Sequence, residues 1–234
     1  MSLPNGLGEA EGFTLLDAAP DEPLAVAGWQ LINGVAQPVG LYRVNDGALE
    51  VIADTTMAAP GFGENRFPNF FYGAVLAGGQ VVFGTKIVTE SALYRATATG
   101  QTRIVTSTQN LPVVGTAAIQ FQSLAFDGDT VFFVAATAGL QQQVALRVNA
   151  AGEVTRLLAR DDGIPGTADT VRSFGPATAA NGSVYLTVFN PGFARQVLEW
   201  RAGELRRIAG PGMAVNGGGT VQAIESSYLP VAGG

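Results

Sequence analysis

Runs of β-branched and aromatic residues recur along the chain, and Gly, Pro, Asn or Asp lies on either side of each run. The strongest runs occupy residues 24–26, 81–83, 131–134 and 184–189. Continuous apolar runs of this length predict strands that are buried on both faces. No segment shows the 3.6-residue periodicity of an amphipathic helix, so the pattern predicts an all-β protein.

A second motif follows each apolar run and shows that the pattern is a repeat. It pairs an aromatic residue or leucine with arginine, at Tyr42-Arg43, Tyr94-Arg95, Leu146-Arg147 and Trp200-Arg201. The arginines stand 52, 52 and 54 residues apart. Repeats of this length are units that bury their apolar faces against their neighbours rather than alone.

Each unit contains four predicted strands. A glycine-containing turn follows the arginine strand, as in Asn45-Asp46-Gly47, and predicts a tight hairpin. The next strand carries charged residues, which indicates a partly solvated edge. A long loop rich in Pro and Gly then leads to a strand marked by two apolar residues three positions apart. These apolar pairs are Phe67 and Phe70, Phe121 and Leu124, Val171 and Phe174, and Val221 and Ile224.

The lengths of the connections predict where one sheet ends and the next begins. Short turns join antiparallel neighbours, and long loops pass between sheets. Four four-stranded sheets are therefore expected over residues 13–53, 67–106, 119–159 and 171–209, with one additional strand at 219–229. Such sheets arranged around an axis form a β-propeller, here with four complete blades plus an extra C-terminal strand in a four- or five-bladed ring. A stacked β-solenoid is the alternative, although its coils are usually shorter.

We expect one repeat domain over residues 13–234, preceded by an N-terminal tail over residues 1–12. The combination of an apolar pair, an Asn-Gly or Asp-Gly turn, a Val-Phe strand, an aromatic-arginine pair and a Pro-Gly loop resembles an uncharacterised bacterial repeat family. Members of that family have propeller-like units of about this length and are often secreted or surface-anchored. The resemblance implies an extracellular or cell-surface protein, and it supplies no catalytic residues.

Composition excludes several classes of function. The chain is 47% hydrophobic and 14% charged, with a formal net charge of -6, which disfavours nucleic-acid binding because phosphate contacts need clustered Lys and Arg. It has no cysteine and no histidine, so thiolate chemistry, the commonest general base and the commonest transition-metal ligand are excluded. No apolar run approaches the length of a membrane span. We expect no cofactor and no bound metal.

The candidate ligand-binding residues are polar side chains beside the apolar pairs on the inner strands. They are Asn69, Gln122, Ser173, Gln222 and Glu225. Propellers present concave sites around their axis, where loops on a rigid scaffold place binding groups. The alternative interpretation is that these side chains only bind water in a channel.

Three other patterns have both a chemical and a structural interpretation. The repeated arginines suit an anion-binding ring, but recurrence once per unit favours contacts to a neighbouring sheet. Asp127-Gly128-Asp129 and Asp161-Asp162-Gly163 resemble calcium loops, but Asp-Gly favours a turn. Asp17 and Glu225 would meet if a ring closed, as a glycosidase carboxylate pair requires, although isolated acids at strand ends are usually solvated.

The sequence therefore predicts a non-catalytic propeller module that binds a glycan, a small ligand or a protein. Two other classes remain open. One is a structural protein that self-associates by strand addition through the C-terminal strand. The other is a glycoside hydrolase that depends on carboxylates alone.

Overall fold

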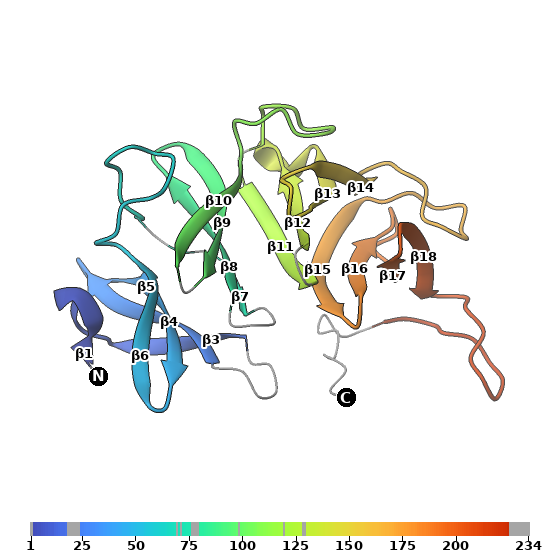
Figure 1. The fold of residues 1–234 in the computed structure, drawn as a ribbon. Helices are drawn as coiled ribbons and strands as arrows, with labels where there is room; N and C mark the ends of the chain where they lie inside the picture. The colour runs from blue at the N-terminus through green and yellow to red at the C-terminus, as the bar shows by residue number, and fades with distance from the viewer. Residues whose placement is uncertain are drawn as a thin grey trace. The chain divides into compact units, whose positions relative to one another are not determined.

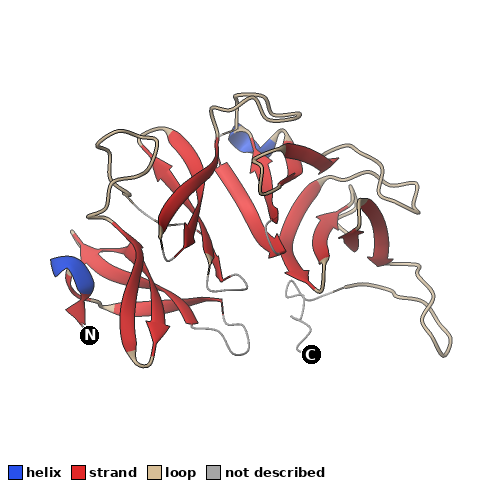
Figure 2. Ribbon diagram, in the orientation of Figure 1, coloured by secondary structure: helices blue, strands red, loops and turns tan. Residues whose placement is uncertain are grey.

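A computed structural model of the chain describes residues 2–17, 24–68, 70, 72–75, 80–97, 99–118, 120–127 and 130–224 (Figure 1). Over these residues the chain is built from strands and loops, with two short 3₁₀ turns, η1 (Pro4–Gly6) and η3 (Ala138–Leu140) (Figure 2). Within that part of the chain no helix is long and apolar enough to span a membrane.

Four four-stranded antiparallel sheets follow one another along the chain, and in each sheet the strands are ordered as in the sequence. Blade 1 contains β3 (Gly12–Asp17), β4 (Leu24–Ile32), β5 (Val35–Asn45) and β6 (Ala48–Asp54). Blade 2 contains β7 (Tyr72–Val75), β8 (Val81–Ile87), β9 (Glu90–Thr97) and β10 (Gly100–Thr106). Blade 3 contains β11 (Gln120–Asp127), β12 (Thr130–Ala136), β13 (Gln143–Val148) and β14 (Val154–Ala159). Blade 4 contains β15 (Ser173–Ala180), β16 (Ser183–Phe189), β17 (Arg195–Arg201) and β18 (Glu204–Ala209).

The predicted class is confirmed: the chain is all-β, and its sheets are propeller-type blades whose boundaries match the predicted sheets closely. The chain forms two compact units, Met1–Gln109 with blades 1 and 2 and Asn110–Gly234 with blades 3 and 4. In each unit the first strands of the two blades lie against each other, β3 against β7 and β11 against β15. Neighbouring propeller blades pack in this way.

Apolar side chains fill the space between the two blades of each unit. Between blades 1 and 2, Phe67, Phe83 and Tyr94 form an aromatic cluster, with the Phe67 and Tyr94 rings 5.1 Å apart and nearly perpendicular. Between blades 3 and 4, Phe132 of β12 lies 5.2 Å from the Trp200 ring of β17. The aromatic residue of the repeated arginine motif is thus a packing residue: Tyr42 and Tyr94 are fully buried, and Trp200 is partly buried.

Tight turns occupy the predicted positions. Asp46-Gly47 and Asn181-Gly182 connect neighbouring strands, and all four residues have positive φ, as a type I′ hairpin turn requires. The turn predicted at Asp127-Gly128 lies partly outside the described residues.

The N-terminal segment is more ordered than the predicted tail. Residues 2–9 include a two-stranded ribbon, β1 (Ser2–Leu3) and β2 (Gly8–Glu9), with η1 between its strands. Leu3 is buried against Val26, Val39 and Tyr42 on the face of blade 1 that does not pack on blade 2. In a repeat array, each unit normally covers the apolar face of its neighbour. Here the N-terminal segment covers the apolar face of blade 1 that lies away from blade 2.

The additional C-terminal strand predicted at 219–229 is not formed over the described residues of that segment. Thr220 makes an isolated bridge to Ala214, and residues 221–224 have no strand conformation. Gly217, Gly218 and Gly219 all have positive φ, which bends the chain away from an extended path. Residues 225–234 lie outside the described residues.

Candidate functional site

The predicted inner-strand residues are placed on two neighbouring strands and one loop. Gln122 lies on β11 and Ser173 begins β15; both are half-buried, and the two strands lie side by side within one compact unit. Gln222 is exposed, lies outside any strand and donates a hydrogen bond to Thr220 Oγ1 at 3.0 Å. Asn69 and Glu225 lie outside the described residues. The ligand-binding role of all five residues stays a prediction.

Ser123 is an inner-strand residue that the sequence pattern did not single out. It lies where the pairing of β11 with β12 shifts between Gln122 and Ala125, and its φ is +52°. Its hydroxyl donates a hydrogen bond of 2.7 Å to the carbonyl of Gly175 on β15. This hydrogen bond joins β11 to β15 at the irregularity next to Gln122.

A repeated feature that the sequence analysis missed lies on the hairpin between the second and third strands of each blade. Each of these hairpins exposes at least one large apolar side chain at or near its tip. These side chains are Leu31, Ile32 and Val35 in blade 1, Val88 in blade 2, Leu140 in blade 3 and Phe193 in blade 4. Val88 is 73% exposed and Phe193 is 65% exposed.

The backbone at three of these tips adopts a conformation that bulky residues rarely take. The φ angles are +56° at Val88, +57° at Leu140 and +62° at Phe193. Only a few per cent of non-glycine residues have positive φ, and a β-branched residue such as Val88 is a clear outlier. Such residues cost about 1–3 kcal/mol each and cluster at functional sites.

The topology places these hairpins beside the long Pro/Gly loops. In a four-stranded antiparallel blade the second and fourth strands run in the same direction, so the turn after the second strand and the loop after the fourth lie at the same end. We call this the loop end of a blade. Within each long loop, one isolated antiparallel β-bridge pairs two residues of the loop. These pairs are Ala58–Arg66, Leu111–Gly115, Gly163–Thr170 and Ala214–Thr220. Val113 and Val215 on these loops are also exposed.

In the second unit, the loop 160–172 holds the hairpin tips of both blades. Arg160 Nη1 donates a hydrogen bond of 2.8 Å to the carbonyl of Leu140. The Arg172 guanidinium carbon lies 3.8 Å from the centre of the Phe193 ring, and its Nη1 donates to the carbonyl of Pro191 at 3.3 Å. The exposed apolar tips are therefore fixed in place by neighbouring arginines.

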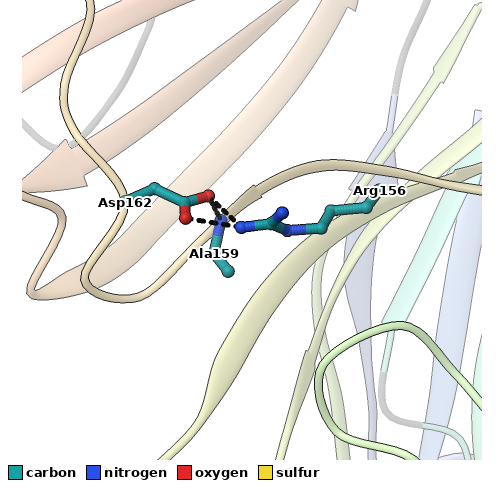
Figure 3. A network of polar contacts seen from close by, with 3 residues as sticks. All are labelled: Arg156, Ala159 and Asp162. Atoms are coloured by element: carbon teal, nitrogen blue, oxygen red, sulfur yellow. Dashed lines mark hydrogen bonds and ion pairs between the residues drawn. The ribbon is translucent and has the colours of Figure 1, made fainter.

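Asp162 of the same loop stabilises a turn through its carboxylate. Both carboxylate oxygens of Asp162 accept hydrogen bonds of 2.5 Å from Arg156, and Oδ2 also accepts one of 2.7 Å from the amide of Ala159 (Figure 3). This contact agrees with the turn interpretation of Asp161-Asp162-Gly163. Among the described residues, no group of three or more His, Cys, Asp or Glu is arranged to hold a metal ion.

The described contacts of the repeated arginines agree with a packing role. The Arg147 guanidinium lies 5.0 Å from the Trp200 ring of the next blade. Arg43 pairs with Glu50 at 3.6 Å in a cavity of about 200 Å³ in the first unit. Ligand pockets usually measure roughly 300–1,000 Å³, so this cavity is small for an organic ligand.

Among the side chains that the structure describes, three ionisable groups have shifted pKa values. The Ser183 hydroxyl donates a hydrogen bond to the Glu199 carboxylate, and the Arg206 guanidinium donates a second one. Both bonds lower the pKa of Glu199. Burial raises the pKa of Tyr42 to about 12, and the negative charge of Asp54 adds to the effect. Burial likewise raises the pKa of Tyr94 to about 12, where the hydroxyl donates to the carbonyl of Pro60 at 3.0 Å. These groups take part in packing and hydrogen-bond networks inside the blades.

Comparison with known proteins leaves the activity open. Neither a family model nor a curated protein sequence matches the chain. Among solved structures, a protein from Lactobacillus plantarum is similar with a TM-score of 0.42 and 14% identity, over 85% of this chain and 67% of that chain. An engineered GH43 glycoside hydrolase with endo-xylanase and exo-arabinofuranosidase activity is similar with a TM-score of 0.36 and 10% identity, over 87% of this chain. This chain spans 42% of that enzyme's length, and similarity at this level assigns it no activity.

Proposed function

We propose that the chain is a non-catalytic β-propeller binding module that recognises a protein partner through the loop end of its blades. The observation that carries the proposal is the exposed apolar residue with positive φ at the hairpin tips of blades 2, 3 and 4. A turn alone would form at lower energy with Asn or Gly, as it does at Asn33-Gly34 in blade 1. An exposed apolar side chain in a costly conformation is better explained by contact with a partner.

A protein partner fits the chemistry of the tips better than a glycan or a small ligand does. The tip side chains of blades 1, 2 and 3 are aliphatic, and blade 4 adds one aromatic ring beside an arginine. The cores of protein interfaces are enriched in apolar, aromatic and arginine side chains. Glycan and small-ligand binding remain outcomes of the test.

The test compares binding by wild type with binding by a triple variant, Val88→Ser, Leu140→Ser and Phe193→Ser, on protein and glycan arrays. Leu24→Ser is the matched control, because Leu24 is 42% exposed but begins β4, at the opposite end of blade 1. We expect protein ligands that bind wild type and the control and lose about tenfold or more in affinity with the triple variant. Equal binding by all three proteins, or turnover of a sugar or ester panel, would contradict the proposal.

We also propose that the protein acts outside the cell or on its surface. The support is the resemblance of the repeat to a bacterial family that is often secreted or surface-anchored. Cleavage of the protein by a protease added to intact cells would agree with this location. Recovery only from lysed cells would contradict it.

A further inference from the structure

Blade 4 presents an aromatic ring and a guanidinium group as one exposed surface. Phe193 is 65% exposed, Arg172 is exposed, and the guanidinium carbon is 3.8 Å from the ring centre. Within the described part of the chain, this guanidinium donates one hydrogen bond, from Nη1 to Pro191. A guanidinium that lies over a ring keeps the N–H groups along its edges clear of the ring, and such groups can bind a carboxylate bidentately.

The surface is held rigidly before any partner arrives. Asn190 accepts a hydrogen bond of 2.7 Å from the amide of Ala194, and its Nδ2 donates to Asp169 Oδ2 at 2.7 Å. The amide of Arg172 donates to the carbonyl of Phe189 at 2.7 Å. The hairpin between β16 and β17 and the loop 160–172 are therefore held together by hydrogen bonds. Binding to a preorganised surface loses less conformational entropy.

A similar pair in blades 1 and 2 shows what is particular to blade 4. The Arg103 guanidinium lies 5.5 Å from the Phe62 ring, and its Nη1 donates to the carbonyl of Gly61 at 3.0 Å. Phe62, however, is half-buried and packs against the core between those two blades. The ring in the first unit contributes to folding, whereas Phe193 keeps most of its surface in water.

From this contrast we infer that Arg172 and Phe193 form a docking site for a protein segment in which a carboxylate lies next to an apolar side chain. The inference rests on the proposed function and names the chemistry of the partner. The guanidinium covers one face of the Phe193 ring, and the same loop fixes the aliphatic tip Leu140 through Arg160. A ring with one face covered by a guanidinium leaves less stacking surface for a sugar, and it suits apolar side chains of a peptide better.

The test is a titration of the full chain, followed by heteronuclear NMR, with two matched peptides. One peptide is acetyl-Leu-Asp-Leu-Asp-Leu-amide and the other has Asn in place of Asp. We expect the acidic peptide to shift the amide signals of Gly192 to Ala194 and the side-chain signal of Arg172, and to bind about fivefold more tightly than its neutral counterpart. Glucuronic acid is titrated in parallel as the sugar probe.

Variants of Arg172 and Phe193 distinguish three contributions to peptide binding: the positive charge, the planar guanidinium group and the apolar contact with the ring. Arg172→Gln should bind both peptides equally, Arg172→Lys should keep only part of the discrimination, and Phe193→Ser should lose binding of both. Arg103→Gln is the matched control and should behave as wild type. Equal binding of both peptides by wild type, discrimination retained by Arg172→Gln, or equivalent shifts at lower concentration with glucuronic acid would overturn the inference. Peptide signals that map to Val88 or Val35 instead would overturn it while leaving the proposed function standing.

Discussion

Asn5 donates a hydrogen bond of 2.7 Å from its side-chain nitrogen Nδ2 to Oδ2 of Asp54, joining the N-terminal segment to the end of β6. Asp54 is fully buried, and its other oxygen accepts hydrogen bonds from the amide and hydroxyl of Thr56 at 2.8 and 2.6 Å. Gln30 also holds the segment, by donating from its side chain to the carbonyls of Leu7 and Glu9. The segment over blade 1 is thus both packed and hydrogen-bonded.

Replacing Asp54 should destabilise the protein more than replacing Asn5. Asp54→Ala removes the buried carboxylate that accepts hydrogen bonds from Asn5 and from the amide and hydroxyl of Thr56, at a cost of about 2–4 kcal/mol in the free energy of unfolding. Asn5→Ala removes only one of these contacts and should cost about 1 kcal/mol. Urea denaturation measures both. Equal small losses would show that the Asp54 network contributes little.

The two buried tyrosines should respond oppositely to loss of their hydroxyl groups. The Tyr94 hydroxyl donates to Pro60, so Tyr94→Phe should cost about 1 kcal/mol. The Tyr42 hydroxyl is buried and has no hydrogen-bond partner among the described residues, so Tyr42→Phe should be neutral or slightly stabilising. Thermal unfolding of the two variants beside wild type tests the difference. A larger loss for Tyr42→Phe than for Tyr94→Phe would contradict it.

Gly28 and Gly40 should tolerate no side chain, because the Tyr42 ring lies directly over both. A β-carbon added at Gly28 would lie 2.8 Å from Tyr42 Cε2, and one added at Gly40 would lie 2.9 Å from the same atom. Gly40→Ala should therefore destabilise by about 1–3 kcal/mol through overpacking. Gly12→Ala is the control, since nothing lies near its missing β-carbon. Chemical denaturation that gives the same midpoint for both variants would refute the close contact.

Glu199 should make stability depend on acid pH. Its pKa is lowered in the folded protein by Ser183 and Arg206, so the stabilisation is present above the ordinary value of 4.5 and is lost as the pH falls through the lowered value. The free energy of unfolding of wild type should therefore drop more steeply on acidification than that of Glu199→Gln. Denaturation curves collected from neutral to strongly acid pH measure this. Parallel pH profiles would contradict the assignment.

The strained tip of blade 2 predicts a variant that gains stability and loses binding. Asn tolerates positive φ far better than Val, so Val88→Asn should stabilise by about 1 kcal/mol. Val35→Asn is the control, because Val35 is similarly exposed but begins a strand, where Val is favoured. Thermal unfolding and array binding are measured on the same samples. Destabilisation by Val88→Asn would contradict the strain argument.

The four four-stranded sheets, their strand order and their boundaries follow from the sequence because local signals determine them. Asn181-Gly182 and Asp46-Gly47 specify tight turns by their φ preferences, and runs such as 131–134 are apolar enough to be buried on both faces. The packing role of Arg147 also followed from its recurrence once per unit.

The other features of the fold and of the candidate site depend on contacts between distant residues, which local sequence patterns do not show. Residues 2–9 lack a strong strand signal, and their order comes with contacts to distant residues such as Gln30, Tyr42 and Asp54. The exposure of Val88 and Phe193 was not predicted, because an apolar residue in a hairpin is ordinarily assigned to the core. The inner-strand candidates were chosen as polar residues beside apolar pairs, and that pattern gave no indication of the bulge at Ser123.

The central claim, that the loop end of the blades binds a protein partner, is tested most directly by site-specific photo-cross-linking to a protein ligand from the array. A benzophenone amino acid is placed in turn at position 193, on the hairpin tip of blade 4, and at position 202, on the exposed turn between β17 and β18 at the opposite end of the same blade. We predict an adduct with the partner from position 193 and none from position 202. An adduct from position 202 alone, or equal yields from both positions, would contradict the account.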